Sequence, residues 1–255
     1  MKTRANPSLT LEFMIACSLF GTLVTLLMVV YPHTTVQDYF LRKPIVGSVF
    51  LLICAWGSLT AVSPRKCSIA HETQMSRQLM NSPAKTGSPA SSSKGHHPDC
   101  GKFSAHVIRF RGTSYCAACT GLFAGGIIAM IVTSLYFFLG FNVGPSGFPA
   151  ALIGLLGLTS GLIQFKLRSW ARSAANLLFV LGSSLMLIGV DQLVGSVLID
   201  TYIIGLIILW ILTRIMISQW DHQRICLSCG FSCAAETKAN VLSSATHSVQ
   251  RADDD

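Results

Sequence analysis

Charged residues are scarce in this chain of 255 residues. Only 12% of them are Asp, Glu, Lys or Arg, whereas 51% are apolar. An ordinary soluble domain has roughly 25% charged residues. So few charges cannot cover a globule of this size with a surface that water wets. The composition therefore excludes a soluble enzyme of standard build, a disordered chain and a fibrous one.

The sequence also lacks the common catalytic and nucleotide-binding motifs. It contains no P-loop, no glycine-rich nucleotide fingerprint, no serine nucleophile elbow and no H-E-x-x-H pair. Acidic residues number 11 against 19 basic ones, which gives a net charge of +8. In a membrane protein such an excess reflects Lys and Arg kept on the cytoplasmic side rather than a nucleic-acid partner. We therefore expect neither a nucleic-acid partner nor an enzyme of these kinds.

Six stretches are long and apolar enough to cross a bilayer, for which a helix needs about 20 apolar residues. They cover residues 11–31, 45–62, 119–140, 148–165, 173–190 and 197–218. This pattern predicts an all-α fold, a polytopic helical bundle embedded in the lipid bilayer. The last two spans form a hairpin, and we expect Asp191 and Asp200 at its tip. Arg214 lies near the inner end of the last span, from which it can reach the interface.

The orientation follows from where the basic residues fall. With the N-terminus inside, all 19 Lys and Arg residues except Arg42 and Lys43 lie in the inner segments. This bias predicts that both termini are cytoplasmic in a multi-pass protein of the cell membrane. The first stretch resembles a signal peptide, but no small-x-small cleavage site follows it, so we expect a retained anchor.

This layout divides the chain into five parts. Residues 1–63 hold the first two membrane helices, and residues 64–95 form a cytoplasmic linker rich in Ser, Pro, Gly and Ala. Residues 96–120 form a small cytoplasmic Cys/His segment, and residues 119–218 form the four-helix membrane portion. The tail, residues 219–255, contains cysteines and is predicted to be disordered at its polar end.

Among residues that could bind a metal or react, the cysteines show the clearest pattern of positions. Of nine, Cys17 and Cys54 lie within apolar spans and are expected to be buried small hydrophobes. The other seven fall on the predicted cytoplasmic side, where structural disulfides are rare. Clustered cytosolic cysteines more often bind metal.

The strongest cluster is a C-x-x-C pair that follows a short His- and Cys-containing run. Two cysteines three residues apart can bind one ion, and an upstream His and Cys can complete a tetrahedron. Thiolate and imidazole ligands suit zinc. The candidate ligands are His96, His97, Cys100, Cys116 and Cys119. The spacing does not choose between the first two, and His106 is a further candidate, either as a ligand or as a partner of one.

A second cluster lies in the tail. Its candidate ligands are Cys226, Cys229 and Cys233, and Gly230 permits the sharp turn of a zinc knuckle. His222 or Cys67 could supply a fourth ligand. Alternatively, the two C-x-x-C pairs combine into one four-cysteine site.

The pair of Cys116 and Cys119 also fits redox chemistry. Both lie at the predicted start of the third span, and a helix N-terminus stabilises a thiolate. That is the setting of a thiol-disulfide active site. Such an enzyme does not need His96, His97 or Cys100, which the metal site uses.

Residues 96–126, HHPDCGKFSAHVIRFRGTSYCAACTGLFAGG, carry a resemblance. They resemble a family of small uncharacterised prokaryotic, mainly archaeal, membrane proteins with a Cys/His segment followed by C-A-x-C-T-G at the start of a membrane helix. The matching residues are His96, Phe103, Cys116, Ala117, Cys119, Thr120 and Gly121. Where that family has a Cys directly before the His, this chain has Gly95. The match covers about thirty residues and implies a polytopic membrane protein with a metal-binding motif and no known activity.

Three function classes remain. A closed zinc site favours a structural, adaptor or regulatory membrane protein whose loop and tail bind a cytoplasmic protein partner. The alternatives are a membrane thiol-disulfide oxidoreductase and a transporter of small solutes or metals. The transporter is disfavoured because polar residues within the spans are few. Gln164 and Asn176 are expected near the inner helix ends, where water reaches them.

Overall fold

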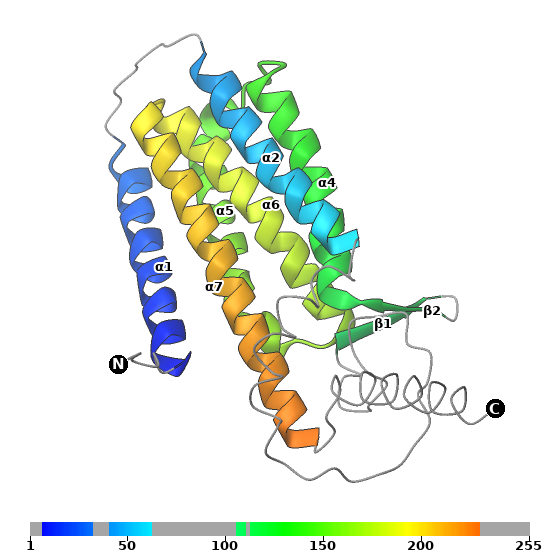
Figure 1. The fold of residues 1–255 in the computed structure, drawn as a ribbon. Helices are drawn as coiled ribbons and strands as arrows, with labels where there is room; N and C mark the ends of the chain where they lie inside the picture. Colours follow the sequence, from blue (N-terminus) through cyan, green and yellow to red (C-terminus); the bar gives the residue numbers. More distant parts are fainter. Residues whose placement is uncertain (1–6, 33–40, 63–105, 111–112, 230–255) are drawn as a thin grey trace, which may run out of the picture.

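The computed structural model describes residues 7–32, 41–62, 106–110 and 113–229 (Figure 1). In this part of the chain six helices are long and apolar enough to cross a membrane, as the sequence predicts. The helices are α1 (Pro7–Val30), α2 (Arg42–Val62), α4 (Ala117–Phe137), α5 (Gly147–Ile163), α6 (Ser169–Val194) and α7 (Val197–Cys229). Short 3-10 turns, η4 (Gly144–Ser146) and η5 (Gln164–Lys166), flank α5. The chain is thus a helical bundle with the composition of a multi-pass membrane protein.

Prolines mark where helices begin. Pro7 is the first residue of α1, and Pro44 and Pro149 lie in the first turns of α2 and α5. A proline in the first turn costs no hydrogen bond, because the first N–H groups of a helix have no partner within it. Gly195 ends α6 in the left-handed conformation, with φ of 61°, and its N–H bonds to the Asp191 carbonyl.

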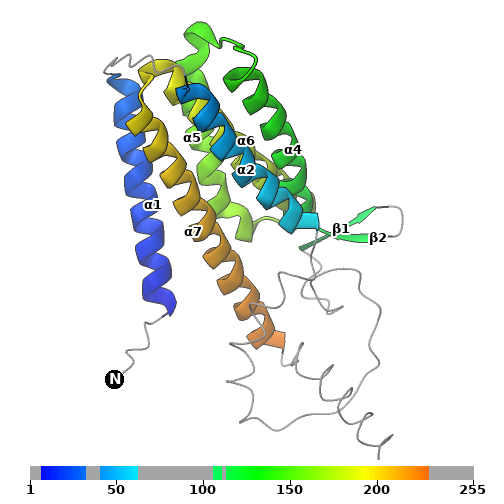
Figure 2. The same cartoon turned by 45° about the horizontal axis from the view of Figure 1, so that its top comes forward.

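Helix α6 lies at the centre of the bundle. It packs against α4, α5 and α7, while α2 lies outside α4 and α1 lies outside α7 (Figures 1 and 2). Of its span, 61% is buried inside the bundle, against 22–39% for the other five. The charged residues within this span, Arg172 and Asp191, are 3% and 2% exposed.

Glycines let α5 and α6 approach closely. A Cβ on Gly182 would lie 2.6 Å from the Leu158 nitrogen and 2.7 Å from the Gly154 oxygen. A Cβ on Gly189 would lie 2.5 Å from the Ala151 nitrogen. In lipid, helices associate through such close packing, because the tails around them are as apolar as leucine.

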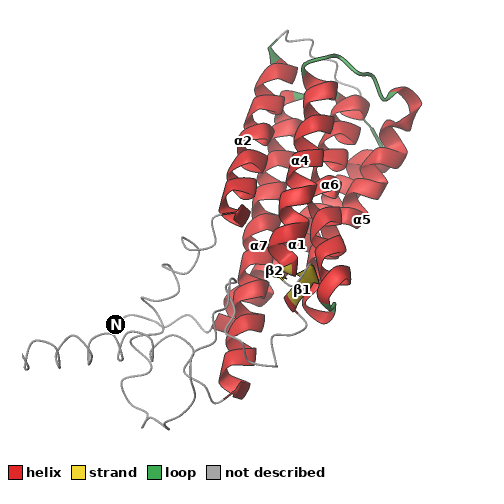
Figure 3. Ribbon diagram, turned by 90° about the vertical axis from the view of Figure 1, so that its right-hand side faces the viewer, coloured by secondary structure: helices red, strands yellow, loops and turns green. Residues whose placement is uncertain are grey.

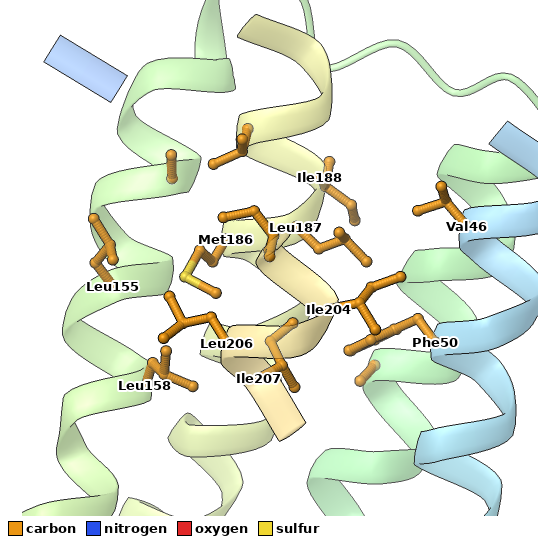
Figure 4. Close-up of a cluster of buried hydrophobic side chains, with 14 of the residues drawn as sticks. Val46, Phe50, Leu155, Leu158, Met186, Leu187, Ile188, Ile204, Leu206 and Ile207 are labelled. Carbon is orange, nitrogen blue, oxygen red and sulfur yellow. The ribbon is translucent and has the colours of Figure 1, made fainter. Parts of the chain in front are cut away.

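Apolar side chains fill the space between the helices and also cover the outside. Figure 4 shows the interior, where Leu158 of α5, Met186 and Leu187 of α6 and Ile207 of α7 interdigitate. On the outside, Leu52 is 71% exposed, one of many large apolar side chains that point away from the bundle. A soluble protein rarely exposes so much apolar surface, whereas a bilayer covers it.

Helix α1 is attached to α7 by a row of polar contacts. The hydroxyls of Ser18 and Thr213 lie 2.8 Å apart, and the Trp210 indole donates to the Thr22 hydroxyl at 3.0 Å. About two turns away on α7, the Tyr202 hydroxyl donates to the Gly21 carbonyl. Hydrogen bonds of this kind hold helices together where the surroundings are apolar.

A two-stranded hairpin precedes α4, and the sequence analysis does not predict it. Strands β1 (Val107–Phe110) and β2 (Thr113–Cys116) are antiparallel, with Val107 opposite Cys116. The hairpin lies at the end of the bundle where α4 begins (Figure 3). Four-residue strands without alternating polarity leave little trace in a sequence read for membrane spans.

The helix ends differ from the predicted limits in two places. Helix α7 continues to Cys229 instead of ending near Ser218, so the first part of the predicted tail is helical. Helices α6 and α7 are separated by only Gly195 and Ser196, a shorter connection than the predicted tip. Both changes extend helices into polar sequence, which hydropathy alone does not assign to helix.

The close packing of α5 and α6 makes a testable prediction for Gly182. Gly182→Ala places a Cβ against two backbone atoms and should destabilise the fold by about 1–3 kcal/mol. Gly205→Ala is the matched control, because nothing lies within 4 Å of a Cβ there. It should leave stability unchanged or raise it by up to about 1 kcal/mol. Thermal unfolding in detergent, followed by circular dichroism, measures both, and equal midpoints would contradict the packing argument.

Candidate functional site

The C-x-x-C pair lies where β2 passes into α4. Cys116 is the last residue of β2 and the N-cap of α4, with φ of −67° and ψ of 119°, and Cys119 lies in the first helical turn. The Thr120 hydroxyl donates to the Cys116 carbonyl at 2.9 Å. Residues three apart in a helix start are neighbours on one side. Both thiols are half-buried, so the pair is reachable without being fully exposed.

The start of α4 is held tightly against the start of α6. A Cβ on Gly121 would collide with the Ser173 carbonyl oxygen, so only glycine permits this approach. The pair of thiols is therefore fixed beside the first turn of α6. That turn also carries Arg172, which is 3% exposed.

Arg214 of α7 reaches the same region from the other side. It is 8% exposed, its Nε donates to Asn176 Oδ1 at 2.8 Å, and its Nη2 donates to the same oxygen. Cys116, Cys119 and Arg172 are near enough to interact electrostatically with its guanidinium. The expectation that Arg214 reaches the membrane interface is wrong, because α7 continues past it and packs it inside the bundle.

A second group of side chains joins the hairpin to the bundle. Arg172 Nη1 lies 3.0 Å from His106 Nε2, and Arg172 Nη2 donates to Asp221 Oδ2 at 3.4 Å. A guanidinium only donates, so in this contact Nε2 of His106 is the acceptor. Ser169, with a strained φ of 40°, donates to the Val107 carbonyl at 3.1 Å. These contacts tie β1 to α6 and α7.

The charges at this end of the bundle do not balance. Arg172 and Arg214 are both buried, and Asp221 compensates only one of them. Within the described residues, Arg214 has the neutral Asn176 as its hydrogen-bond partner and no carboxylate. A buried charge without a counter-ion is costly. The thiolate forms of Cys116 and Cys119 are the groups beside it that can supply the missing negative charge.

The described residues bring together only part of the predicted metal ligands. Of the first set, Cys116 and Cys119 are placed at the start of α4, whereas His96, His97 and Cys100 lie outside the described residues. Of the second, Cys226 and Cys229 belong to the end of α7, and Cys233 lies outside. In the described part of the chain no three His, Cys, Asp or Glu residues are grouped to hold a metal. In His106, the further candidate, Nε2 lies 3.0 Å from Arg172 Nη1.

The polar residues expected near water are also enclosed. Gln164 is 1% exposed, and Asn176 is fully buried. Asn176 Oδ1 accepts a hydrogen bond from Arg214, and Asn176 Nδ2 donates to the Arg172 carbonyl at 2.7 Å. The expectation that water reaches them at helix ends is wrong, because η5 and the long α7 cover this end of the bundle.

The opposite end of the bundle contains a buried ion cluster. Arg42 Nη1 donates to Asp200 Oδ2 at 2.7 Å and also to Asp191 Oδ1. The Tyr136 hydroxyl donates to Asp191 Oδ2 at 2.6 Å, and the Lys43 ammonium lies 4.7 Å from the Tyr136 ring centre. The two aspartates do flank the tip of the hairpin, as predicted. They are 2% and 0% exposed and lie within α6 and α7, so both carboxylates are buried.

A signal for this cluster is present in the sequence. Arg42 and Lys43 are the two basic residues of the predicted outer side, and Asp191 and Asp200 are two carboxylates near the same side. Opposite charges at one depth of a membrane pair with each other. Comparing the depths of charges in different spans, instead of reading each span alone, would have found the cluster.

Comparison of the chain with models of known protein families, with curated proteins and with solved structures finds no match. The function must therefore be argued from the two ends of the bundle.

The buried ion cluster of Arg42, Asp191, Asp200 and Tyr136, called the outer cluster below, makes a testable prediction for Arg42. Arg42→Met leaves two buried carboxylates without their cation and should cost about 3–5 kcal/mol of stability. Lys43→Met, the neighbouring control, removes a cation whose contact within the described residues is the Tyr136 ring, and it should cost about 1 kcal/mol or less. Tryptophan fluorescence during thermal unfolding in detergent measures the difference. Equal midpoints for the two variants would mean that the cluster contributes no more than an exposed charge.

Proposed function

We propose that this chain is a multi-pass membrane protein with a structural zinc ion at the end of the bundle where α4 begins. The ligands are Cys116, Cys119, Cys100 and one of His96 and His97. Four protein ligands close the coordination shell, so no position remains for a substrate water. The site ties the inner loop to the bundle, and the loop and tail form a surface for a cytoplasmic protein partner.

The observation that carries this proposal is the uncompensated charge of Arg214. A zinc ion bound by three thiolates and one neutral imidazole carries one net negative charge, since two positive charges meet three negative ones. Arg214 is a buried cation without a carboxylate partner in the described residues, and it is near enough to both cysteines of the pair to interact with them electrostatically. The proposed centre and this guanidinium therefore neutralise each other.

The anchoring role is supported by the contacts around the pair. Gly121 packs against Ser173, and the hairpin is joined to α6 and α7 through His106 and Arg172. A ligand pair on such a rigid support restrains whatever it binds. Zinc at this place would restrain the segment before β1 in the same way.

We also propose that both termini are cytoplasmic in the cell membrane. The beginnings of α1, α4 and α6 and the ends of α2 and α7 lie at one end of the bundle (Figure 1). Every basic residue except Arg42 and Lys43 belongs to segments that adjoin this end. The positive-inside rule then assigns that end to the cytoplasm.

A thiol-disulfide oxidoreductase is the second candidate. Cys116 caps the N-terminus of α4, and Arg214 lies beside both thiols. A helix N-terminus and a nearby cation each favour the thiolate, which is the nucleophile in thiol exchange. A transporter receives less support, because the core between the two charge clusters is mostly apolar (Figure 4), and the buried polar side chains there are hydroxyls such as those of Thr133 and Ser183.

Metal analysis of the purified protein tests the first proposal. Elemental mass spectrometry should find about one zinc ion per chain, and the ion should be absent from the Cys116→Ser/Cys119→Ser variant, because two ligands cannot hold it at low concentration. Cys17→Ser is the control, since Cys17 lies within α1. About two zinc ions falling to one would add a separate site in the tail.

The same experiment separates the two candidates. A wild-type protein without metal, in which Cys116 and Cys119 react readily with an alkylating reagent, would overturn the zinc proposal and support the oxidoreductase.

Reporter fusions test the proposed orientation. Green fluorescent protein at the C-terminus should fluoresce, because it folds in the cytoplasm, and alkaline phosphatase there should be inactive. Insertion of each reporter after Gly144, at the opposite end of the bundle, should reverse both results. An active phosphatase at the C-terminus would contradict the assignment.

A further inference from the structure

A narrow cavity lies between α2 and α7 near the outer cluster. Its volume is about 190 Å³, and one wall is the stripe of Arg42, Ile45, Val46 and Val49 on α2. This spacing of three and four residues keeps the four on one face of a helix. From the first to the last of them the wall is about 10 Å long, at 1.5 Å per residue.

Helix α7 forms the facing wall with Val197, Thr201 and Ile204. Their spacing also keeps them on one helix face. The Thr201 hydroxyl donates to the Val197 carbonyl at 2.8 Å, so its polar group is satisfied within the helix. Apart from Arg42, the cavity is thus lined by side chains that prefer an apolar occupant.

The cavity opens sideways, towards the surroundings of the bundle. Ile45, Val49 and Val197 are 53%, 39% and 38% exposed. Helix α2 packs mainly against α4, and α1 packs against α7 and α5, so no helix of the described residues covers the face of α7 between α1 and α2 (Figure 2). In a membrane this face meets lipid directly.

Arg42 places a cation at the outer end of this apolar wall. Its Nη1 makes both bonds to the aspartates, and within the described part of the chain Nε and Nη2 make no hydrogen bond. The Nε and Nη2 edge of a guanidinium is the fork that binds a phosphate through two parallel hydrogen bonds. Lys43, whose ammonium lies 4.7 Å from the Tyr136 ring centre, adds a second cation beside Arg42, so the formal charges of Arg42, Lys43, Asp191 and Asp200 sum to zero.

We propose that the groove between α2 and α7 binds one acyl chain of a membrane glycerophospholipid, whose phosphate pairs with Arg42. The occupant is a lipid because the groove is apolar, faces the bilayer and ends in a cation at the depth where helices α2 and α7 begin. A cavity of this size is too small for a typical small-molecule ligand, which needs roughly 300 Å³ or more. It suits a single narrow chain. This inference does not depend on the zinc proposal.

Native mass spectrometry of the purified full-length chain, after extensive detergent exchange, tests the proposal. The wild type should retain phospholipid. Val49→Trp fills the groove and should lower the retained phospholipid at least about tenfold, the change that accompanies a loss of about 1.4 kcal/mol of binding free energy. Leu52→Trp is the matched control on the same helix, because Leu52 is exposed and does not line the cavity, and it should retain the lipid.

Three further variants keep the test decisive. Thr201→Trp fills the groove from α7 and should repeat the loss, and Ile208→Trp, exposed on the same helix, should not. Arg42→Lys keeps the charge but removes the fork, so it should lower phospholipid retention while the folded protein is still recovered. Equal retention in the filled and control variants would overturn the proposal.

A photo-crosslinking residue at position 49, in native membranes, identifies the occupant directly. A phospholipid adduct at position 49 that free phospholipid competes away supports the proposal. An adduct to residues 33–40 of the same chain, or to a second copy, would overturn it and show that protein covers the groove.

Discussion

The close approach of helix backbones around α6 is the constraint on which the rest of the structure depends. In lipid, apolar side chains gain little by leaving one apolar environment for another, so helices must be joined by tight packing and by polar contacts. The glycines of α5 and α6 provide the packing, and Gly121 brings α4 to the same helix. Because α6 is enclosed on several sides, the charged residues at its two ends become buried and must find partners on other helices.

The charges at the ends of α6 oppose the dipole of that helix. Arg172 lies in the first turn, where the dipole disfavours a cation, and Asp191 lies in the last turn, where it disfavours an anion. Arg42, at the start of α2, is placed in the same unfavourable way. These buried charges must therefore be stabilised by specific partners. The partners are Asp221 and His106 at one end, and Asp200 and Tyr136 at the other. This arrangement makes each cluster a connection between helices rather than a cap for one of them.

The sequence predicted much of the fold because hydropathy is a one-dimensional property. It gave the number of spans and, within a few residues, most of their ends. It placed Cys116 and Cys119 at the start of a helix, which the structure confirms. It did not predict that Arg214 lies inside the bundle or that Arg42 meets Asp191, because those contacts join residues far apart in the chain. The membership of His96, His97 and Cys100 in a metal site stays a prediction, since they lie outside the described residues.

The partners of Arg42 have a consequence for the order in which this protein is assembled. Asp191 and Asp200 follow Arg42 by 149 and 158 residues, and Thr213, which bonds to α1, follows Ser18 by 195. A ribosome delivers the first two helices to the membrane long before it has made the helices that neutralise and hold them. Until then, α1 and α2 lack these contacts with α6 and α7. Helix α7, the last of the six described spans, therefore closes the bundle, by joining α1 along one side and enclosing Arg42 on the other.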